Sequence, residues 1–461
     1  MSNQQLDRPL NAQEHRFYLV PNAHISLVAR LRGKIAEELF RKAVKKVVAT
    51  YPHLETSIVS KEGELWFDSK NAANIAIKSV TRENDDTWFE AIDGEHKIPV
   101  RLSEGPLARF VLVSDKEMTE IIIFVHHALA DGMSLYYVLR DLLTFVNEPH
   151  RPIEAKPIPP AVTEEMMPDH LSLGRIKKWL LGRLNKKWAD EKVTFDEDDA
   201  LRLHELFWKK YDYKAHLLLL DEEQTTKFIK ACRNHGVTVN SALCTIFMKA
   251  RIKIIGDYKD EKARLVFAVD ARERLKIHIG ENVGFYAGGV DLDYKYPNKP
   301  FWGLTKDFHE TATKELTNNA IFEPVLYQYL MDPTLMDAVA IYGFAKILGI
   351  TEEESQKIGG YLKNNDHLAR KVFEKRMDDI PDLILTNLTR LKLPQRVNGA
   401  ELERVFFTPS SGMKAELVIG ACDAAGKLSV SVNYMEPSQD GPTLERIRDQ
   451  SMQILEAEVG F

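Results

Sequence analysis

Two adjacent histidines, His126 and His127, are the residues of this chain with the clearest chemical potential. They follow residues 121–125, an apolar run rich in β-branched side chains that predicts a strand. Three residues separate His127 from Asp131, and Gly132 comes next. An imidazole has a pKa of about 6.5, so it can accept a proton from a reacting hydroxyl or amine at neutral pH. A strand that ends in this way can aim one imidazole into a cleft, and the spacing therefore predicts an acid–base site.

The four polar and glycine positions of this segment have different expected roles. Side chains alternate along a strand, so His126 should point away from His127 and be structural, while His127 is the candidate general base. Asp131 has two interpretations: it orients the imidazole as a triad carboxylate does, or it is buried and needs a cation beside it. Gly132 is expected to keep space open beside the base or to adopt a positive φ.

Two alternatives to catalysis apply to the histidine pair. One is a structural histidine at a strand end, whose ring nitrogens are hydrogen-bonded within the protein. The other is a metal site made by His126, His127 and Asp131, but neighbouring strand residues diverge and no further ligand lies close in the sequence. We therefore expect no metal and no prosthetic group.

The surrounding pattern predicts the elements that position this segment. A helical spacing of apolar residues begins at Leu135, so the histidines lie on a strand–turn–helix junction. In the first part of the chain the pattern predicts strands at 24–31, 64–67 and 74–80, a helix at 35–50, and a hairpin of 109–114 with 120–126. In the second part it predicts strands at 213–220, 265–269, 289–292, 383–387, 403–408, 415–421 and 428–434, and helices at 221–234, after Thr238, through most of 301–375, and at 443–459.

The order of these elements predicts an α/β protein in two halves. Residues 1–149 form an N-terminal half that carries the histidine segment, and residues 206–461 form a C-terminal half. Residues 150–205 between them begin with a proline-rich stretch and contain an acidic cluster at 196–199, so we interpret them as a crossover.

Composition narrows the class of protein. The 461 residues are 44% hydrophobic and 28% charged, which is typical of a globular chain. The 62 basic and 68 acidic residues give a net charge of −6, which argues against nucleic-acid binding. The cysteines Cys232, Cys244 and Cys422 form no CxxC pattern, so a disulfide framework or cysteine zinc site is not expected. The N-terminus is polar and no apolar stretch approaches a membrane span, so we expect a cytoplasmic protein.

Residues 175–188 form a basic amphipathic stretch. Ile176, Trp179, Leu180 and Leu184 can share one helix face, against six lysines and arginines. Such a stretch could contact anionic lipid, the phosphates of coenzyme A or an acidic carrier protein, although the activity requires no membrane. The alternative, which we favour, is a crossover helix packed on the body with a solvated basic face.

Residues 126–132 match the HHxxxDG signature of the chloramphenicol-acetyltransferase-like acyltransferases, a superfamily that includes nonribosomal peptide synthetase condensation domains, BAHD acyltransferases and wax ester synthases. The DFGWG element of the BAHD branch is absent. Glu55 stands where the family segment HPxLRT has arginine, and Thr389 stands where SNxG has glycine. Further segments that resemble the family in the expected order are 51–56, 105–109, 269–274, 282–285 and 386–388.

The resemblance implies two similar α/β halves that form a V-shaped pseudo-dimer, with a central channel and the histidine segment midway along it. It also implies that Asp131 pairs with an arginine, for which Arg272 is the candidate. Asn282, Thr386 and Asn387 are candidates for an oxyanion donor or for the channel wall by their place in the family pattern, and each has a purely structural role as its alternative.

The function that follows is an acyltransferase with His127 as general base. It would move an acyl group from a thioester to a hydroxyl or amine of a small or lipid-like acceptor, without a covalent acyl-enzyme. The expected thioester donor is acyl-CoA. One alternative is an amide-forming condensation enzyme that takes its donor from an acyl carrier protein. The other is a non-catalytic scaffold or carrier-docking module.

Overall fold

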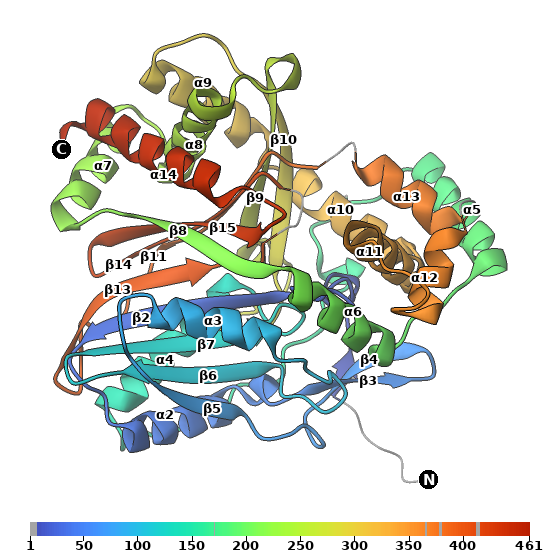
Figure 1. The fold of residues 1–461 in the computed structure, drawn as a ribbon, viewed down its shortest axis with the longest axis horizontal. Coiled ribbons are helices and arrows are strands. Elements are labelled where there is room, and N and C mark those ends of the chain that lie inside the picture. The colour runs from blue at the N-terminus through green and yellow to red at the C-terminus, as the bar shows by residue number, and fades with distance from the viewer. Residues whose placement is uncertain (1–6, 170, 365–366, 378–379, 412–414) are drawn as a thin grey trace.

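The computed structural model describes residues 7–169, 171–364, 367–377, 380–411 and 415–461. Two six-stranded sheets form the body, one above the other in Figure 1, and a group of helices lies beside them. A small three-stranded sheet, β1 (Arg8–Pro9), β4 (Glu64–Asp68) and β3 (Ser57–Lys61), lies below that group. The chain is therefore an α/β protein, as the order of elements predicts.

The first sheet contains the histidine segment and is covered on both faces. Its order is β12 (Arg396–Val397), β13 (Ala400–Thr408), β2 (His24–Arg32), β7 (Met118–His126), β6 (Ala108–Ser114) and β5 (Ala76–Thr81). On β7, Ile121 and Ile123 pack in the core cluster with the helices α2 (Glu37–Thr50) and α4 (Gly132–Asn147). Ile122 and Phe124 alternate with them and pack towards α3 (Thr87–Lys97). Burial on both faces explains why the strand reads as a continuous apolar run.

The second sheet lies wholly in the C-terminal part of the chain. Its order is β10 (Ala287–Lys295), β9 (Lys262–Asp270), β11 (Leu383–Arg390), β14 (Leu417–Ala424), β15 (Lys427–Glu436) and β8 (Asp212–Leu219). The helices α7 (Glu222–Asn234), α8 (Val239–Ile255), α9 (Phe301–Glu315) and α14 (Gly441–Leu455) pack with it around a second core. The strands and helices predicted for both halves are confirmed to within a few residues.

One segment of the C-terminal half, residues 206–461, crosses into the first sheet. Strands β12 and β13 come from the C-terminal part but complete the first sheet, where β13 pairs antiparallel with β2 from Thr408 opposite Ser26 to Glu401 opposite Arg32 (Figure 1). Residues 206–461 thus also supply two strands of the first sheet. A boundary drawn along the sequence misses this exchange, because the pairing depends on a free strand edge hundreds of residues away.

The crossover region is more helical than the sequence predicts. After an irregular stretch it forms α5 (Arg175–Glu191) and α6 (Glu197–Lys210). The acidic cluster begins α6, where Asp196 and Asp199 form a capping box that places negative charge at the helix N-terminus. α5 packs in the helical group with α10 (Asn318–Leu330) and α13 (Leu368–Met377), which α11 (Pro333–Leu348) and α12 (Gln356–Lys363) complete.

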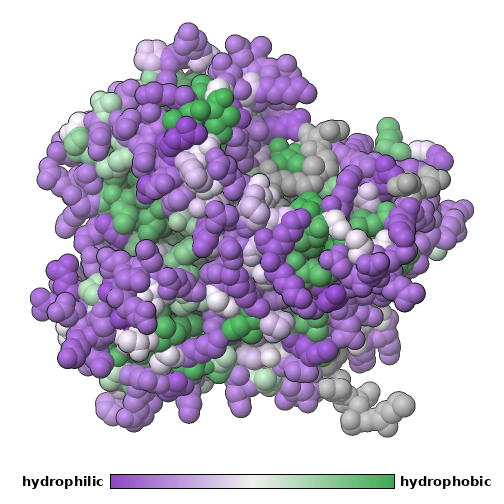
Figure 2. All heavy atoms as spheres, in the orientation of Figure 1, coloured by the Kyte–Doolittle hydropathy of each residue, from purple (hydrophilic) through white to green (hydrophobic). Residues whose placement is uncertain are grey.

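The surface in Figure 2 is mainly hydrophilic, with apolar atoms in separate patches. Within the described residues, no helix combines the length and apolarity that crossing a membrane requires. Cys232, Cys244 and Cys422 are free and buried, and burial raises the pKa of the Cys232 thiol to about 12.

Candidate active site

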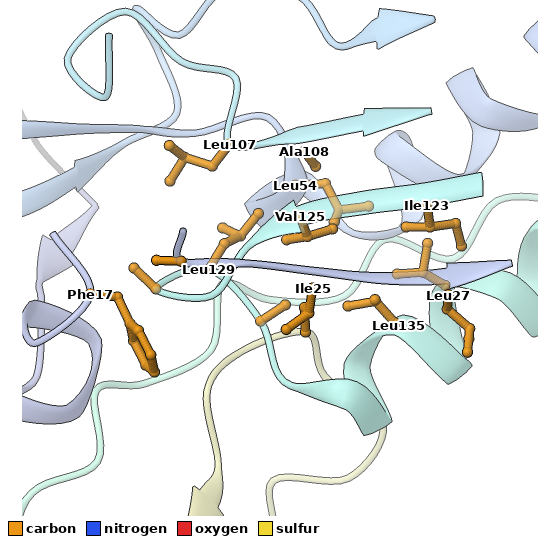
Figure 3. Packing of buried hydrophobic residues seen from close by; sticks show 14 of the residues in the cluster. Phe17, Ile25, Leu27, Leu54, Leu107, Ala108, Ile123, Val125, Leu129 and Leu135 are labelled. Carbon is orange, nitrogen blue, oxygen red and sulfur yellow. The ribbon is translucent and has the colours of Figure 1, made fainter. Parts of the chain in front are cut away.

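The turn that carries the histidines is anchored on both sides by the first core. Val125 on β7 and Leu129 in the turn pack with Ile25 on β2 and Leu135 on α4 (Figure 3). The backbone N–H of His127 donates to the carbonyl of Ala23 at 2.7 Å. These contacts fix the position of the His127 backbone, from which its imidazole projects.

A backbone carbonyl sets the tautomer of His127. Its Nδ1 lies 2.9 Å from the carbonyl oxygen of Ala130, and a carbonyl can only accept, so Nδ1 carries the proton. The neutral ring therefore has its lone pair on Nε2, the atom that can accept a proton from a substrate. Burial lowers the pKa of His127 to about 4, so the imidazole is neutral at pH 7.

Two aromatic rings from different parts of the chain flank this imidazole. The centroid of Phe17 lies 4.5 Å from that of His127, and the centroid of Phe285 lies 5.1 Å from it in an edge-on arrangement. The guanidinium of Arg16 lies over Phe17 at 4.5 Å. The sequence does not predict this aromatic enclosure, because no local spacing relates a residue near the N-terminus to one in the second half.

His126 points away from His127 into a cluster of buried histidines. Its ring lies edge-on to His24 at 5.2 Å, and both rings line a small cavity with His204. Its Nδ1 accepts from the backbone of Ala128 at 3.3 Å, and burial lowers its pKa to about 3. The position is that of a core residue, and the opposite directions of the two imidazoles argue against a shared metal. Among the described residues, no group of three or more histidine, cysteine or carboxylate side chains could hold a metal ion.

Asp131 does not orient the imidazole. Its carboxylate accepts from Arg272 at 2.8 and 3.0 Å, from the backbone N–H of Ser134 at 2.9 Å and from that of Tyr286 at 2.9 Å. Burial alone would raise the pKa of this carboxyl, but the charge and hydrogen bonds of Arg272 hold it below its usual value. Asp131 thus begins α4 as its N-cap and joins the two halves, while the Ala130 carbonyl takes the orienting role of a triad carboxylate.

Arg272 provides the cation that the resemblance implies. It lies in the 3₁₀ turn Arg272–Arg274 after β9, is 3% exposed, and also donates to Ser134 Oγ at 2.8 Å and to Asp270 at 3.0 Å. The carbonyl of Gly284 accepts from the backbone of Asp131 at 3.2 Å and from Ser134 Oγ at 2.9 Å. Charge and backbone hydrogen bonds therefore lock the second half against the start of α4.

The structure shows why residue 132 is a glycine. Gly132 lies at the start of α4 without a positive φ, and the position that a Cβ would take is occupied. A Cβ on Gly132 would lie 2.5 Å from Cδ2 of Leu388 and 3.2 Å from Cζ of Phe407. The glycine allows β11 and β13 to approach the helix, and the prediction of a positive φ is wrong.

A cavity of about 440 Å³ extends from the start of α4 into the second half. Its wall is mainly apolar, but it includes a polar group in which Ser241 Oγ lies 3.0 Å from Nδ1 of His309 and 2.9 Å from the hydroxyl of Thr238. It is lined by residues of α4 (Asp131, Gly132, Met133), α8 and its cap (Thr238, Asn240, Ser241), β9 (Phe267, Ala268, Val269, Asp270), β10 (Ala287, Val290), α9 (Phe308, His309, Ala312, Thr313) with Leu316, and β11 (Thr386, Asn387, Leu388, Thr389).

The three candidate oxyanion or channel residues are not brought together. Thr386 and Asn387 line the cavity, but the amide of Asn387 donates to Asn240 at 2.6 Å. Asn282 lies in the loop near Arg272 and donates to the carbonyl of Ile279 at 2.9 Å. Within the part of the chain that the structure describes, the Thr386 hydroxyl makes no hydrogen bond to the protein. The local backbone is unusual: Thr389, in place of the family glycine, has a φ of 60° beside a register shift in β11.

Comparison with known proteins agrees with this architecture. The family model described as "Condensation domain" matches residues 12–163, which include the histidine turn. Gramicidin S synthase 2 of Brevibacillus brevis is 28% identical over 123 residues, which cover 26% of this chain. The chain spans only 3% of the length of that relative.

Solved structures match over nearly the whole chain. The epimerization domain from the third module of tyrocidine synthetase B has a TM-score of 0.61 at 14% identity, with 99% of this chain and 98% of that domain covered. A trichothecene 15-O-acetyltransferase from Fusarium sporotrichioides has a TM-score of 0.63 at 11% identity, with 98% and 95% covered. The chain therefore has the two-halved fold of the condensation-domain and chloramphenicol-acetyltransferase-like superfamily.

Proposed function

We propose that this chain is a condensation-type acyltransferase. It takes an acyl group from a thioester on a carrier protein and joins it to an amine or hydroxyl acceptor, with His127 as general base. The observation that carries the proposal is the 2.9 Å contact between Nδ1 of His127 and the Ala130 carbonyl, which leaves Nε2 free to accept a proton. A carrier-bound donor replaces the expected acyl-CoA, because the matched family model is the condensation domain and gramicidin synthases are among the matched relatives.

The proposed reaction is a direct transfer. The acceptor nitrogen or oxygen attacks the thioester carbonyl carbon, and Nε2 of His127 takes the acceptor's proton as the new bond forms. The tetrahedral intermediate then expels the thiol sulfur, which receives the proton from the imidazolium. A thioester is already activated, so no acyl-enzyme, metal or prosthetic group is needed.

Other residues support this step without taking part in the proton transfer. Asp131 and Arg272 are positioning residues, because they hold the turn and the second half in register. The Thr386 hydroxyl is our candidate donor to the oxyanion, since it lines the cavity without a protein partner among the described residues. The mainly apolar wall favours an acyl chain or acceptor with an apolar body.

The test is acceptor-dependent release of free thiol. Acyl carrier proteins and acyl-CoAs are each mixed with pooled amines and alcohols, and the unchanged 461-residue chain is compared with His127→Ala. His150→Ala is the matched control, because His150 is an exposed histidine outside the site. Circular dichroism and thermal melting of all three proteins exclude unfolding as the cause of any loss.

Each outcome decides between the candidates. Thiol release from acyl carrier protein that disappears only in His127→Ala supports the proposal. Release from acyl-CoA alone would replace it with a CoA-dependent transferase. Release that survives in His127→Ala would end the general-base mechanism, and no release from any donor would favour the non-catalytic module.

A further inference from the structure

The helix α5 exposes an apolar face that the fold does not use. Ile176, Trp179 and Leu180 are 75%, 58% and 54% exposed, and their spacing places them together on one side of the helix. Of the seven large apolar side chains that are exposed in the described residues, these three are adjacent to one another. The helix packs on the body as expected, but Ile176, Trp179 and Leu180 take no part in that packing.

The opposite face of α5 holds the helix to the body. Leu181 and Trp188 are buried, and the Trp188 indole donates to Thr334 Oγ1 at 2.9 Å. Asn185 donates to the carbonyl of Leu330 at 2.7 Å, and Lys177 forms an ion pair with Glu323 of α10. The inner face thus makes the packing, hydrogen-bond and ion-pair contacts that attach α5 to the body. The outer apolar residues are not needed for this attachment.

Positive charge surrounds the exposed apolar residues. Between residues 175 and 188 the helix has six lysines and arginines and no acidic residue, although the whole chain has a net charge of −6. Arg183 lies over the ring of Trp179 at 4.9 Å, one turn further along the same side. Lys186 and Lys187 continue this side and are exposed. The outer surface of α5 is therefore apolar in its first turns, and cationic side chains flank this apolar part and continue towards the C-terminal end of the helix.

We propose that this surface, made by Ile176, Trp179, Leu180, Arg183 and Lys186, binds an anionic lipid membrane at its periphery. The helix lies at the outer edge of the helical group, so a flat surface can reach it (Figure 1). Tryptophan and aliphatic side chains enter the boundary between headgroups and acyl chains, and lysine and arginine attract lipid phosphates. The proposal does not depend on the activity of His127, and it commits to lipid in preference to an acidic protein or a second copy of this chain.

The test is sedimentation of the 461-residue chain with lipid vesicles. Vesicles of phosphatidylcholine alone are compared with vesicles that also contain phosphatidylglycerol. We expect binding to the anionic vesicles only, weakened by added salt, and a blue shift of tryptophan fluorescence. In Trp179→Ala/Leu180→Ala the binding should fall by about tenfold or more, because two anchoring side chains are lost.

The matched control is Ile255→Ala, which removes another exposed apolar side chain, 46% exposed, at the end of α8. It should bind vesicles as the unchanged protein does. Absence of binding to anionic vesicles would overturn the proposal, as would equal binding by the α5 variant and the control. A dimer in size-exclusion chromatography that dissociates in the α5 variant, without lipid binding, would assign the surface to self-association. All variants should keep the same melting temperature, since the changed side chains are exposed.

Discussion

The guanidinium of Arg272 donates to both carboxylate oxygens of Asp131, at 2.8 and 3.0 Å, and the two residues come from different halves of the fold. The side chains of both residues are almost fully buried, at 2% and 3% exposed. The carboxylate of the histidine motif therefore serves the interface between the halves. The imidazole of His127 depends on the Ala130 carbonyl for its orientation.

Loss of one member of this ion pair should destabilise the protein. We expect Arg272→Met to lower the free energy of unfolding by about 3–5 kcal/mol, because it leaves a buried carboxylate without its cation. Asp131→Asn/Arg272→Met should recover part of that loss, since no uncompensated charge remains. Urea unfolding measures both variants. Equal stability of Arg272→Met and the unchanged protein would show that the pair does not hold the halves together.

The pH dependence of initial rates reports the state of His127. Burial lowers the pKa of its imidazole to about 4, so the base is lost only when the pH falls through that value. We expect kcat/KM on the acid side to decline with an apparent pKa well below 6.5, in short assays after a jump from neutral pH. A decline centred at 6.5 or higher would contradict a half-buried imidazole that is neutral in the unliganded protein.

Gly132 should tolerate no side chain unless a neighbour is shortened. In Gly132→Ala the new Cβ would lie 2.5 Å from Cδ2 of Leu388, and we expect a loss of about 1–3 kcal/mol in the free energy of unfolding. Gly132→Ala/Leu388→Ala should lose less than the sum of the two single variants, because the second change removes the clashing atom. Strict additivity in thermal or urea unfolding would show that the two positions are not in contact.

The buried histidine cluster should make the protein labile to acid. Burial lowers the pKa of His126 to about 3 and of His204 to about 4, and it lowers those of His24 and His96 well below the usual value. Between those values and about 6.5 the unfolded chain binds more protons than the folded one, so stability is full above about 6.5 and falls with pH below it.

Each such histidine contributes up to about 1.4 kcal/mol per pH unit in that window. We expect the melting temperature to fall steadily from pH 7 to pH 5, and His204→Gln to make this fall shallower. His150→Gln, at an exposed position, is the control and should leave the slope unchanged. A melting temperature that stays constant down to pH 5 would be incompatible with neutral buried imidazoles.

The cavity should limit the size of the substrate that it receives. Ala312 on α9 lines the wall, and Ala312→Phe would fill part of the 440 Å³. We expect kcat/KM to fall by about tenfold or more for bulky substrates and much less for small ones. Ala73→Phe, at an exposed position, is the control. The same loss for substrates of every size would mean that the cavity does not receive the part of the substrate that was varied.

Much of the local architecture follows from the sequence by itself. The apolar run before His126 and the helical spacing after Gly132 predict the strand–turn–helix junction, because these patterns depend on neighbouring residues only. The opposite directions of His126 and His127 follow from the alternation of a strand. Arg272 was expected only from the resemblance to a family, and α3 and the helix at the acidic cluster were not predicted.

The tertiary structure decided the features that join distant segments. It placed Phe17 and Phe285 around His127, brought Leu388 against Gly132, and carried β13 into the first sheet. It also assigned the orientation of His127 to a backbone carbonyl, which no pattern of side chains can indicate. Local sequence determines which elements form, because helix and strand periodicity are short-range. Long-range packing determines which of their side chains meet, and so it decides the protonation state and the surroundings of His127.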